Sequence, residues 1–247
     1  YTVSPENLRL AKDIAEAHGA LYHVHAAETR AEQADVQNRY GRSVIRHLDH
    51  LGLLDERTVL AHCVHLDDEE IDILVRTGAS AVHNPVSNLK LGSGIARVPD
   101  MLDAGVRVTL GTDGAISGND LDMWLALRLA AMLHKGAAMD AEAVTTAQAL
   151  AMATRDGAVA LQAGDRIGTL EPGKFADMVL IDVQRAHAVP LFEPVTHLVY
   201  STNKSDISHV FLAGEQVVRD GQLTRLDLAG PIAEVQAMAP QIAASIA

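Results

Sequence analysis

The chain has 247 residues, 48% of them hydrophobic, so it is long enough to bury a sizeable core. Lys and Arg number 20 against 32 Asp and Glu, and this net charge of −12 argues against binding to nucleic acid or to an anionic membrane. The single cysteine permits no internal disulfide and no apolar run approaches membrane-spanning length, so we expect a cytoplasmic protein.

Strands and helices alternate over residues 4–161. Serine, proline and glutamate at positions 4–6 are typical of a helix start, and Gly19 ends this first helix. Further helices are predicted over residues 30–52 (with a break near Gly41), 68–77, 96–104, 121–135, 140–151 and 153–161. Strands are predicted over residues 21–25, 57–62, 79–82 and 106–110, and a loop rich in Asn, Ser and Gly over 84–94. This alternation predicts parallel strands joined by helical crossovers.

The pattern changes after Gly164. Residues 167–174 are rich in turn formers, and four strands without long helices between them are predicted over 177–182, 195–200, 207–212 and 216–219. Residues 230–246 are apolar enough for a last helix that packs back on the first region. We therefore expect three units: a region of parallel strands and helices over 1–164, a small β domain over 165–226 and a terminal helix within 227–247.

The candidate site lies where the predicted parallel strands end. These strands finish in turn with His25, His62, His83 and Asp113, and such ends converge on the active site of an α/β barrel. Imidazole and carboxylate ligands suit zinc or iron with a position left open for water. Glu28 follows His25 by three residues, where a carboxylate can move protons.

Each of these residues also has a structural interpretation. A lone histidine at a strand end is more often hydrogen-bonded to the backbone, and we favour that reading for His83. Asp113 can equally form an Asx turn or cap a helix. Cys63 follows His62 directly, but no nucleophile-elbow motif surrounds it, so a small buried apolar role is favoured. The remaining histidines carry no site signal.

Several motifs together resemble the amidohydrolase superfamily and, within it, the 5'-methylthioadenosine/S-adenosylhomocysteine deaminase family. They cover nearly the whole chain in the right order. The first four are His25-Ala-Ala-Glu28-Thr29, Ala61-His62-Cys63-Val64-His65, the stretch His83–Gly92 and Leu110-Gly-Thr-Asp113-Gly114. Three more, Gly168–Asp177, Val210–Gly214 and Val217–Gly221, resemble the C-terminal β segment of the superfamily.

The resemblance implies an α/β fold: the C-terminal part of a distorted (β/α)8 TIM barrel, from about strand five to strand eight, plus a small β-rich domain and a C-terminal helix. By position, His25 and Asp113 resemble the metal ligands of the family. Glu28 resembles the carboxylate that contacts the heterocycle and moves protons, and His62 the histidine beside the metal-bound water. The His-x-His pair of the first barrel strand is absent, so we expect the chain to be part of a longer enzyme.

For that longer enzyme the resemblance implies hydrolytic deamination of an adenosine-type nucleoside such as methylthioadenosine or S-adenosylhomocysteine. Glu28, His62 and Asp113 are the expected catalytic and substrate-binding residues, with one divalent metal, zinc or else iron, and a homo-oligomeric state. Two ligands, His25 and Asp113, are fewer than the three of a usual catalytic site, so weak metal binding by the chain alone is expected. The alternatives are a guanine deaminase or triazine hydrolase of the same superfamily, or a non-catalytic assembly module.

Overall fold

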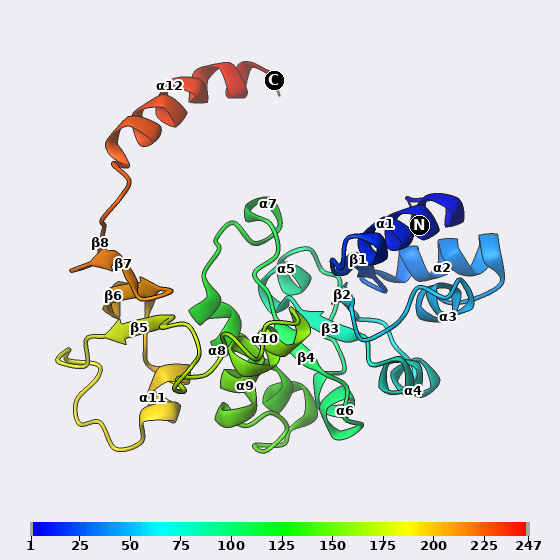
Figure 1. Cartoon of the computed structure of the whole chain (residues 1–247), viewed down its shortest axis with the longest axis horizontal. Helices are drawn as coiled ribbons and strands as arrows, with labels where there is room; N and C mark the ends of the chain where they lie inside the picture. Colours follow the sequence, from blue (N-terminus) through cyan, green and yellow to red (C-terminus); the bar gives the residue numbers. More distant parts are fainter. Residues whose placement is uncertain (1, 246–247) are drawn as a thin grey trace.

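The computed structural model of the chain describes residues 2–245 and contains two sheets (Figure 1). The first is a four-stranded parallel sheet in the order β1 (Tyr22–Ala26), β2 (Thr58–His62), β3 (Ser80–His83) and β4 (Val108–Leu110). The second is a four-stranded antiparallel sheet in the order β5 (Met178–Ile181), β6 (Ile207–Leu212), β7 (Glu215–Arg219) and β8 (Gln222–Leu223). The predicted α/β architecture with parallel strands is confirmed.

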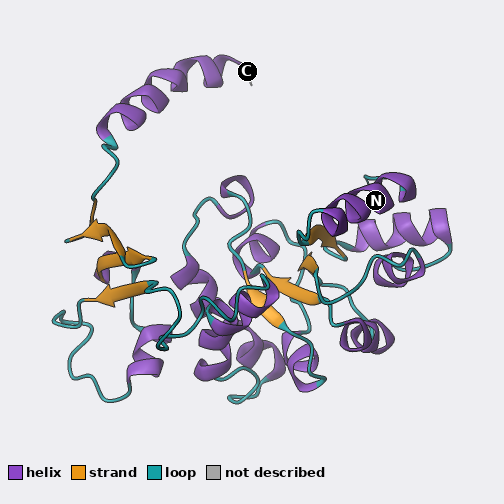
Figure 2. Cartoon of the chain, in the orientation of Figure 1, coloured by secondary structure: helices purple, strands orange, loops and turns teal. Residues whose placement is uncertain are grey.

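Helices connect the parallel strands and pack against their sheet (Figure 2). In chain order they are α1 (Pro5–Ala17), α2 (Arg30–Tyr40), α3 (Val44–His50), α4 (Asp68–Thr77), α5 (Pro85–Lys90), α6 (Val98–Asp103), α7 (Ala115–Gly118), α8 (Met123–Ala138), α9 (Thr146–Ala153) and α10 (Arg155–Ala160). The second region adds α11 (Pro194–Tyr200), the short 3-10 helix η1 (Lys204–Asp206) and α12 (Ala229–Ser245). Among the described residues, no helix combines the length and apolarity needed to cross a bilayer.

Local capping explains where the connecting helices begin and end. Thr29 caps α2, accepting a hydrogen bond from the Glu32 N–H, and the Glu32 carboxylate reaches back in a capping box. Asp67 caps α4 in the same way, and Gly78 ends that helix with a left-handed φ of 74°. Each boundary is therefore specified by residues within one turn of it.

The two faces of the parallel sheet have different surroundings. Side chains such as Tyr22, Leu60 and Val108 point into a core shared with the helices. On the other face His23, Val59, Val82 and Thr109 line a cavity of about 220 Å³, which residues of α10 also line. Along each strand, the side chains of this second face alternate with those of the helix-covered face. The second face corresponds to the inner side of a barrel wall.

Two predicted segments have a different local structure. Residues 195–200 were expected to form a strand but form α11, because Pro194 suits the first helical turn and the Glu193 carboxylate accepts hydrogen bonds from the N–H groups of Val195 and Thr196. The loop expected over residues 84–94 contains α5, which also begins at a proline, Pro85. The β-branched composition of residues 195–200 had favoured a strand, and the polar composition of residues 84–94 had favoured a loop.

The terminal helix α12 forms as predicted but does not pack on the barrel. It extends away from both sheets (Figure 1), and none of its described residues is buried. Much of its apolar content is alanine, which buries little area, so docking would gain little free energy. The expected packing of this segment is therefore wrong, while the predicted unit boundaries at residues 164 and 226 stay a prediction.

A buried histidine pair joins the parallel sheet to α8. The Nε2 atoms of His83 on β3 and His134 on α8 lie 3.3 Å apart, and both residues are at most 2% exposed. Burial, and for His83 also the neighbouring imidazoles of His134 and His62, lowers the pKa of His83 to about 3. Burial lowers the pKa of His134 to about 4. The pair is therefore neutral in the folded chain at physiological pH.

This pair predicts a pH-dependent stability. Because the unfolded chain binds protons near pH 6.5 and the folded pair does not, the free energy of unfolding should fall as the pH drops from about 6.5 towards 4. Each histidine contributes up to about 1.4 kcal/mol per pH unit in that window. Urea unfolding should show a shallower pH slope for His134→Phe than for the natural chain, with the exposed His18→Gln as control. Equal slopes in all three proteins would contradict the assignment.

The parallel sheet also predicts association. Within the described residues β1 and β4 each pair with only one neighbour, which leaves two open strand edges. Open edges promote pairing with other chains. We expect the isolated chain to sediment above the mass of one chain at micromolar concentration. A monodisperse monomer that unfolds cooperatively would contradict this prediction and the expected homo-oligomer.

Candidate metal centre

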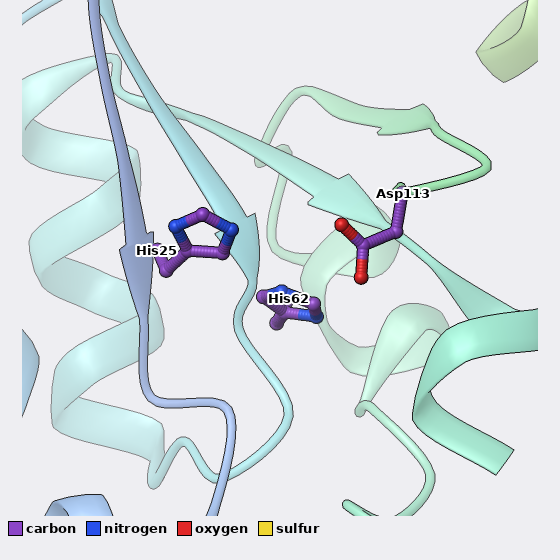
Figure 3. A group of neighbouring side chains, drawn as sticks. All are labelled: His25, His62 and Asp113. Atoms are coloured by element: carbon purple, nitrogen blue, oxygen red, sulfur yellow. The ribbon is translucent and has the colours of Figure 1, made fainter. Parts of the chain in front are cut away.

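Three side chains converge at the carboxyl ends of the parallel strands. His25 lies on β1, His62 ends β2, and Asp113 follows β4 by three residues. One potential ligand atom from each lies within 4.8 Å of those of the other two, and Figure 3 shows the side chains directed toward a common space. The structure thus brings together His25, His62 and Asp113, three of the four predicted site residues.

An unusual backbone conformation aims two of these side chains. Ala27, His62, Cys63 and Asp113 all have left-handed φ angles, between 46° and 78°, although none is glycine. Such residues cost on the order of 1–3 kcal/mol each and persist only where the surroundings hold them. One such restraint is the hydrogen bond from the Cys63 N–H to the Ala26 carbonyl, 3.0 Å long. These four are among the nine non-glycine residues with positive φ in the described part of the chain, and all four lie at the strand ends that carry the cluster.

The left-handed turn decides where His62 points. Alternation along β2 would place His62 on the helix-covered face with Leu60, as its register with Ala26 also indicates. With a φ of 78° the imidazole instead stacks on His25, with ring centroids 5.3 Å apart. His62 therefore lies beside the two predicted ligands, His25 and Asp113, with a ring nitrogen within 4.8 Å of their potential ligand atoms.

His62 and Glu28 are each held by a buried polar neighbour. The Nδ1 atom of His62 lies 2.8 Å from Asn88 Oδ1, and its Nε2 atom faces Glu28 Oε2 at 3.7 Å. The other carboxylate oxygen of Glu28 accepts a hydrogen bond of 3.1 Å from the Ser93 hydroxyl. The Glu28 backbone N–H in turn donates to the Glu32 carboxylate at 2.6 Å. Glu28 thus borders the cluster without belonging to it.

Asp113 is held in its ionised form. Its Oδ2 atom accepts hydrogen bonds of 2.7 Å from both Ser87 and Ser117. Burial alone would raise the pKa of the Asp113 carboxyl, but the two hydroxyls, the Gly114 N–H and the nearby His62 outweigh it and lower the pKa to about 2. The residue is therefore a carboxylate throughout the physiological pH range.

The structure separates the other candidates from the cluster. His83 points to the helix side of the sheet and contacts His134, so its partner is a side chain rather than the loop backbone that we favoured. Cys63 is fully buried, and burial raises the pKa of its thiol, in keeping with a small apolar role. Sequence reasoning missed the hydrogen-bonding residues around the cluster, namely Ser87, Asn88, Ser93 and Ser117. The only signal for the first three was their place in the polar loop after His83.

Gly111 permits the close approach of two strand ends. A Cβ atom at this position would lie 2.4 Å from Asn84 Oδ1 and 2.9 Å from Val82 Cγ1. Because real contacts of this kind are not that short, a larger residue would push apart the ends of β3 and β4. Close packing of the two strand ends therefore explains why a glycine precedes Thr112 and Asp113.

The donor set fits a divalent metal. Two imidazoles and one carboxylate form a common ligand set for zinc, with bonds of about 2.0–2.2 Å and a fourth position open. Ligand atoms within 4.8 Å of one another need only a small further approach to share one ion. A hydrogen-bond network that holds the ligands in place is usual around such sites.

The chain is similar to known proteins over most of its length. The model of the Amidohydrolase family matches residues 1–217. The chain is 42% identical over 228 residues to the 5-methylthioadenosine/S-adenosylhomocysteine deaminase of Syntrophobacter fumaroxidans, covering 92% of this chain and 52% of that protein. It is 43% identical over 228 residues to the 5'-deoxyadenosine deaminase of Methanopyrus kandleri, with the same coverage.

A solved structure has the same fold. The adenosine deaminase of Xanthomonas campestris with bound zinc superposes with a TM-score of 0.96 at 36% identity, over 99% of this chain and 56% of that one. The chain thus spans about half the length of the curated relatives it matches.

The serine pair at Asp113 generates a prediction. Replacing both Ser87 and Ser117 by alanine removes the two hydroxyl donors while burial remains, so the pKa of Asp113 should rise from about 2 by a unit or more. A ¹³C carboxyl titration of the metal-free chain measures the shift. Ser43→Ala, in the connection between α2 and α3, should leave it unchanged. An unaltered Asp113 titration in the double variant would refute the cause given for its low pKa.

The family model covers far more than half of the sequence, so this chain belongs to the amidohydrolase family.

Proposed function

We propose that this chain forms the metal-binding strand ends, from β1 to β4, of a hydrolytic deaminase that acts on adenosine-type nucleosides and releases ammonia. The observation that carries the proposal is the convergence of His25, His62 and Asp113, with the Glu28 carboxylate 3.7 Å from His62 at its border. The names of the similar deaminases support the nucleoside substrate.

Zinc is the proposed metal. His25 and Asp113 are its proposed ligands from this chain, with His62 beside them, since imidazole and carboxylate are borderline-to-hard donors that zinc accepts. The zinc named in the similar Xanthomonas campestris structure supports the same choice over iron. A bound divalent metal supplies water of lowered pKa, so that hydroxide is available near neutral pH.

The two carboxylates have different proposed roles. Asp113 is ionised, with its pKa lowered to about 2, and it accepts a proton from the attacking water. Glu28 lies outside the ligand cluster, and it exchanges a proton with the ring nitrogen beside the reacting carbon. His62, at the stacked edge of His25, orients the attacking oxygen. Water then adds to the carbon that carries the amino group, the C–N bond breaks, and the departing nitrogen takes a proton and leaves as ammonia.

The carboxylate pair is the feature that a deaminase needs. One carboxylate must stay ionised to accept a proton, and the other must be free to pick one up and return it. The serines at Asp113 favour the ionised form, whereas Glu28 has a single hydroxyl donor in the structure. This difference of surroundings supports the division of roles.

The proposal predicts distinct losses in two variants of the natural full-length protein. Asp113→Asn should abolish ammonia release from methylthioadenosine and S-adenosylhomocysteine and also reduce bound zinc, because it removes a ligand and a proton acceptor together. Glu28→Gln should retain zinc but lower kcat by about 10²–10⁴-fold, the usual cost of losing a general acid or base. The exposed His18→Gln is the control and should change neither value.

Ammonia release, the change in purine absorbance and metal analysis provide the measurements. Product release near background from both nucleosides, together with rapid release from guanine or a chlorinated triazine, would overturn the proposed substrate class. An unchanged kcat in Glu28→Gln would overturn the role of Glu28. Purified protein without bound metal after zinc reconstitution would favour the assembly-module alternative.

A further inference from the structure

The segment of residues 84–94, which contains α5, contributes no residue to the cluster of His25, His62 and Asp113 but forms hydrogen bonds to side chains in and beside it. Its hydrogen bonds reach the ends of the three other parallel strands. They join Ser87 to Asp113 at 2.7 Å, Asn88 to His62 at 2.8 Å and Ser93 to Glu28 at 3.1 Å. One short segment thus holds one side chain from each of the neighbouring strand ends.

The bond to His62 determines more than orientation. Asn88 and His62 are each only 1% exposed, so water cannot replace the contact. Asn88 Oδ1 carries no proton, and a hydrogen bond to it therefore requires the proton of a neutral His62 to sit on Nδ1. The second nitrogen, Nε2, is then left with a lone pair.

The surroundings of Nε2 agree with that proton position. A protonated Nε2 would have the Glu28 carboxylate as its natural acceptor, yet Nε2 and Oε2 are 3.7 Å apart, beyond hydrogen-bonding distance. One ring nitrogen of His62 lies within 4.8 Å of potential ligand atoms of His25 and Asp113, and because Nδ1 is engaged by Asn88, Nε2 is the nitrogen left for that cluster. Among the described residues, Nε2 therefore has no acceptor at hydrogen-bonding distance that would favour a proton on it.

We propose that Asn88 is a positioning residue that fixes neutral His62 as the Nδ1–H tautomer, so that Nε2 presents its lone pair to the space between His25 and Asp113. A neutral imidazole in water prefers the opposite tautomer, with the proton on Nε2. The buried amide reverses that preference before any metal or substrate binds. The inference rests on the proposed function only for the use made of the lone pair.

Histidine side-chain ¹⁵N shifts of the metal-free chain provide the test. Magic-angle-spinning NMR on ¹⁵N-histidine-labelled protein tolerates association, and His62 is identified among the 12 histidines as the signal lost in His62→Gln. The spectra are recorded at about pH 8, above the ordinary imidazole pKa of about 6.5. We expect the protonated shift on Nδ1 of His62 and the unprotonated shift on Nε2.

Three variants isolate the cause. Asn88→Leu keeps the size but removes the acceptor, and the Nδ1–H form should fall from the major to the minor species. Asn88→Asp keeps an acceptor oxygen and should retain Nδ1–H. Ser87→Ala removes the neighbouring bond to Asp113 and should leave the His62 tautomer unchanged.

A His62 that carries its proton on Nε2 in the natural chain, or an Asn88→Leu variant with an unaltered tautomer, would overturn the inference. If Asn88→Leu does not fold, the natural chain and Asn88→Asp still decide, because an amide with its NH₂ turned to His62 would switch tautomer on substitution by a carboxylate. Absent turnover in the natural protein with the Nδ1–H form intact would overturn the proposed function and leave this inference standing.

Discussion

The left-handed turn at the end of β2 is the constraint on which the site depends. Without the positive φ angles of His62 and Cys63, strand alternation would direct the His62 imidazole into the helix-covered core. The turn reverses that direction and stacks the ring on His25. The strain is local, and it is held by main-chain hydrogen bonds to the end of β1, including Val64 and His65 N–H to the Ala27 carbonyl at 3.0 Å.

Around this turn the protein surrounds each reactive group with neutral hydrogen-bond partners. Serine hydroxyls bind Asp113 and Glu28, and an amide oxygen binds His62. Neutral donors orient a carboxylate without neutralising its charge by an ion pair, so the cluster keeps the negative charge that attracts a cation. Preorganisation of this kind reduces the reorganisation required when a metal or a substrate binds.

The same arrangement explains the contrast between the two faces of the parallel sheet. The helix side is a continuous apolar core, beside which the neutral His83–His134 pair joins β3 to α8. The opposite side carries the cavity, and the cluster lies at the carboxyl ends of the strands, while β1 and β4 end the sheet with open edges among the described residues. A parallel sheet with two open edges fits a partial barrel, in keeping with a chain that spans about half of its relatives.

Features with local causes could be predicted from the amino-acid sequence. Alternating apolar strands and capped helices predicted the parallel sheet, and the polar residues at successive strand ends predicted where the site lies, because the ends of parallel strands meet at one edge. His25 and Asp113 could be selected in this way. The helical state of residues 194–200 escaped prediction because a cap at Glu193 overrides their β-branched composition.

Features that depend on residues far away in the chain could not be predicted from the sequence and are seen only in the folded structure. The direction of His62 depends on a φ angle stabilised by another strand, and the roles of Ser87, Asn88 and Ser93 depend on groups 26 to 65 residues away in the chain. The exposed position of α12 likewise depends on whether an apolar surface lies within its reach. Periodicity and capping act over a few residues, whereas these contacts form only once the strands are assembled side by side.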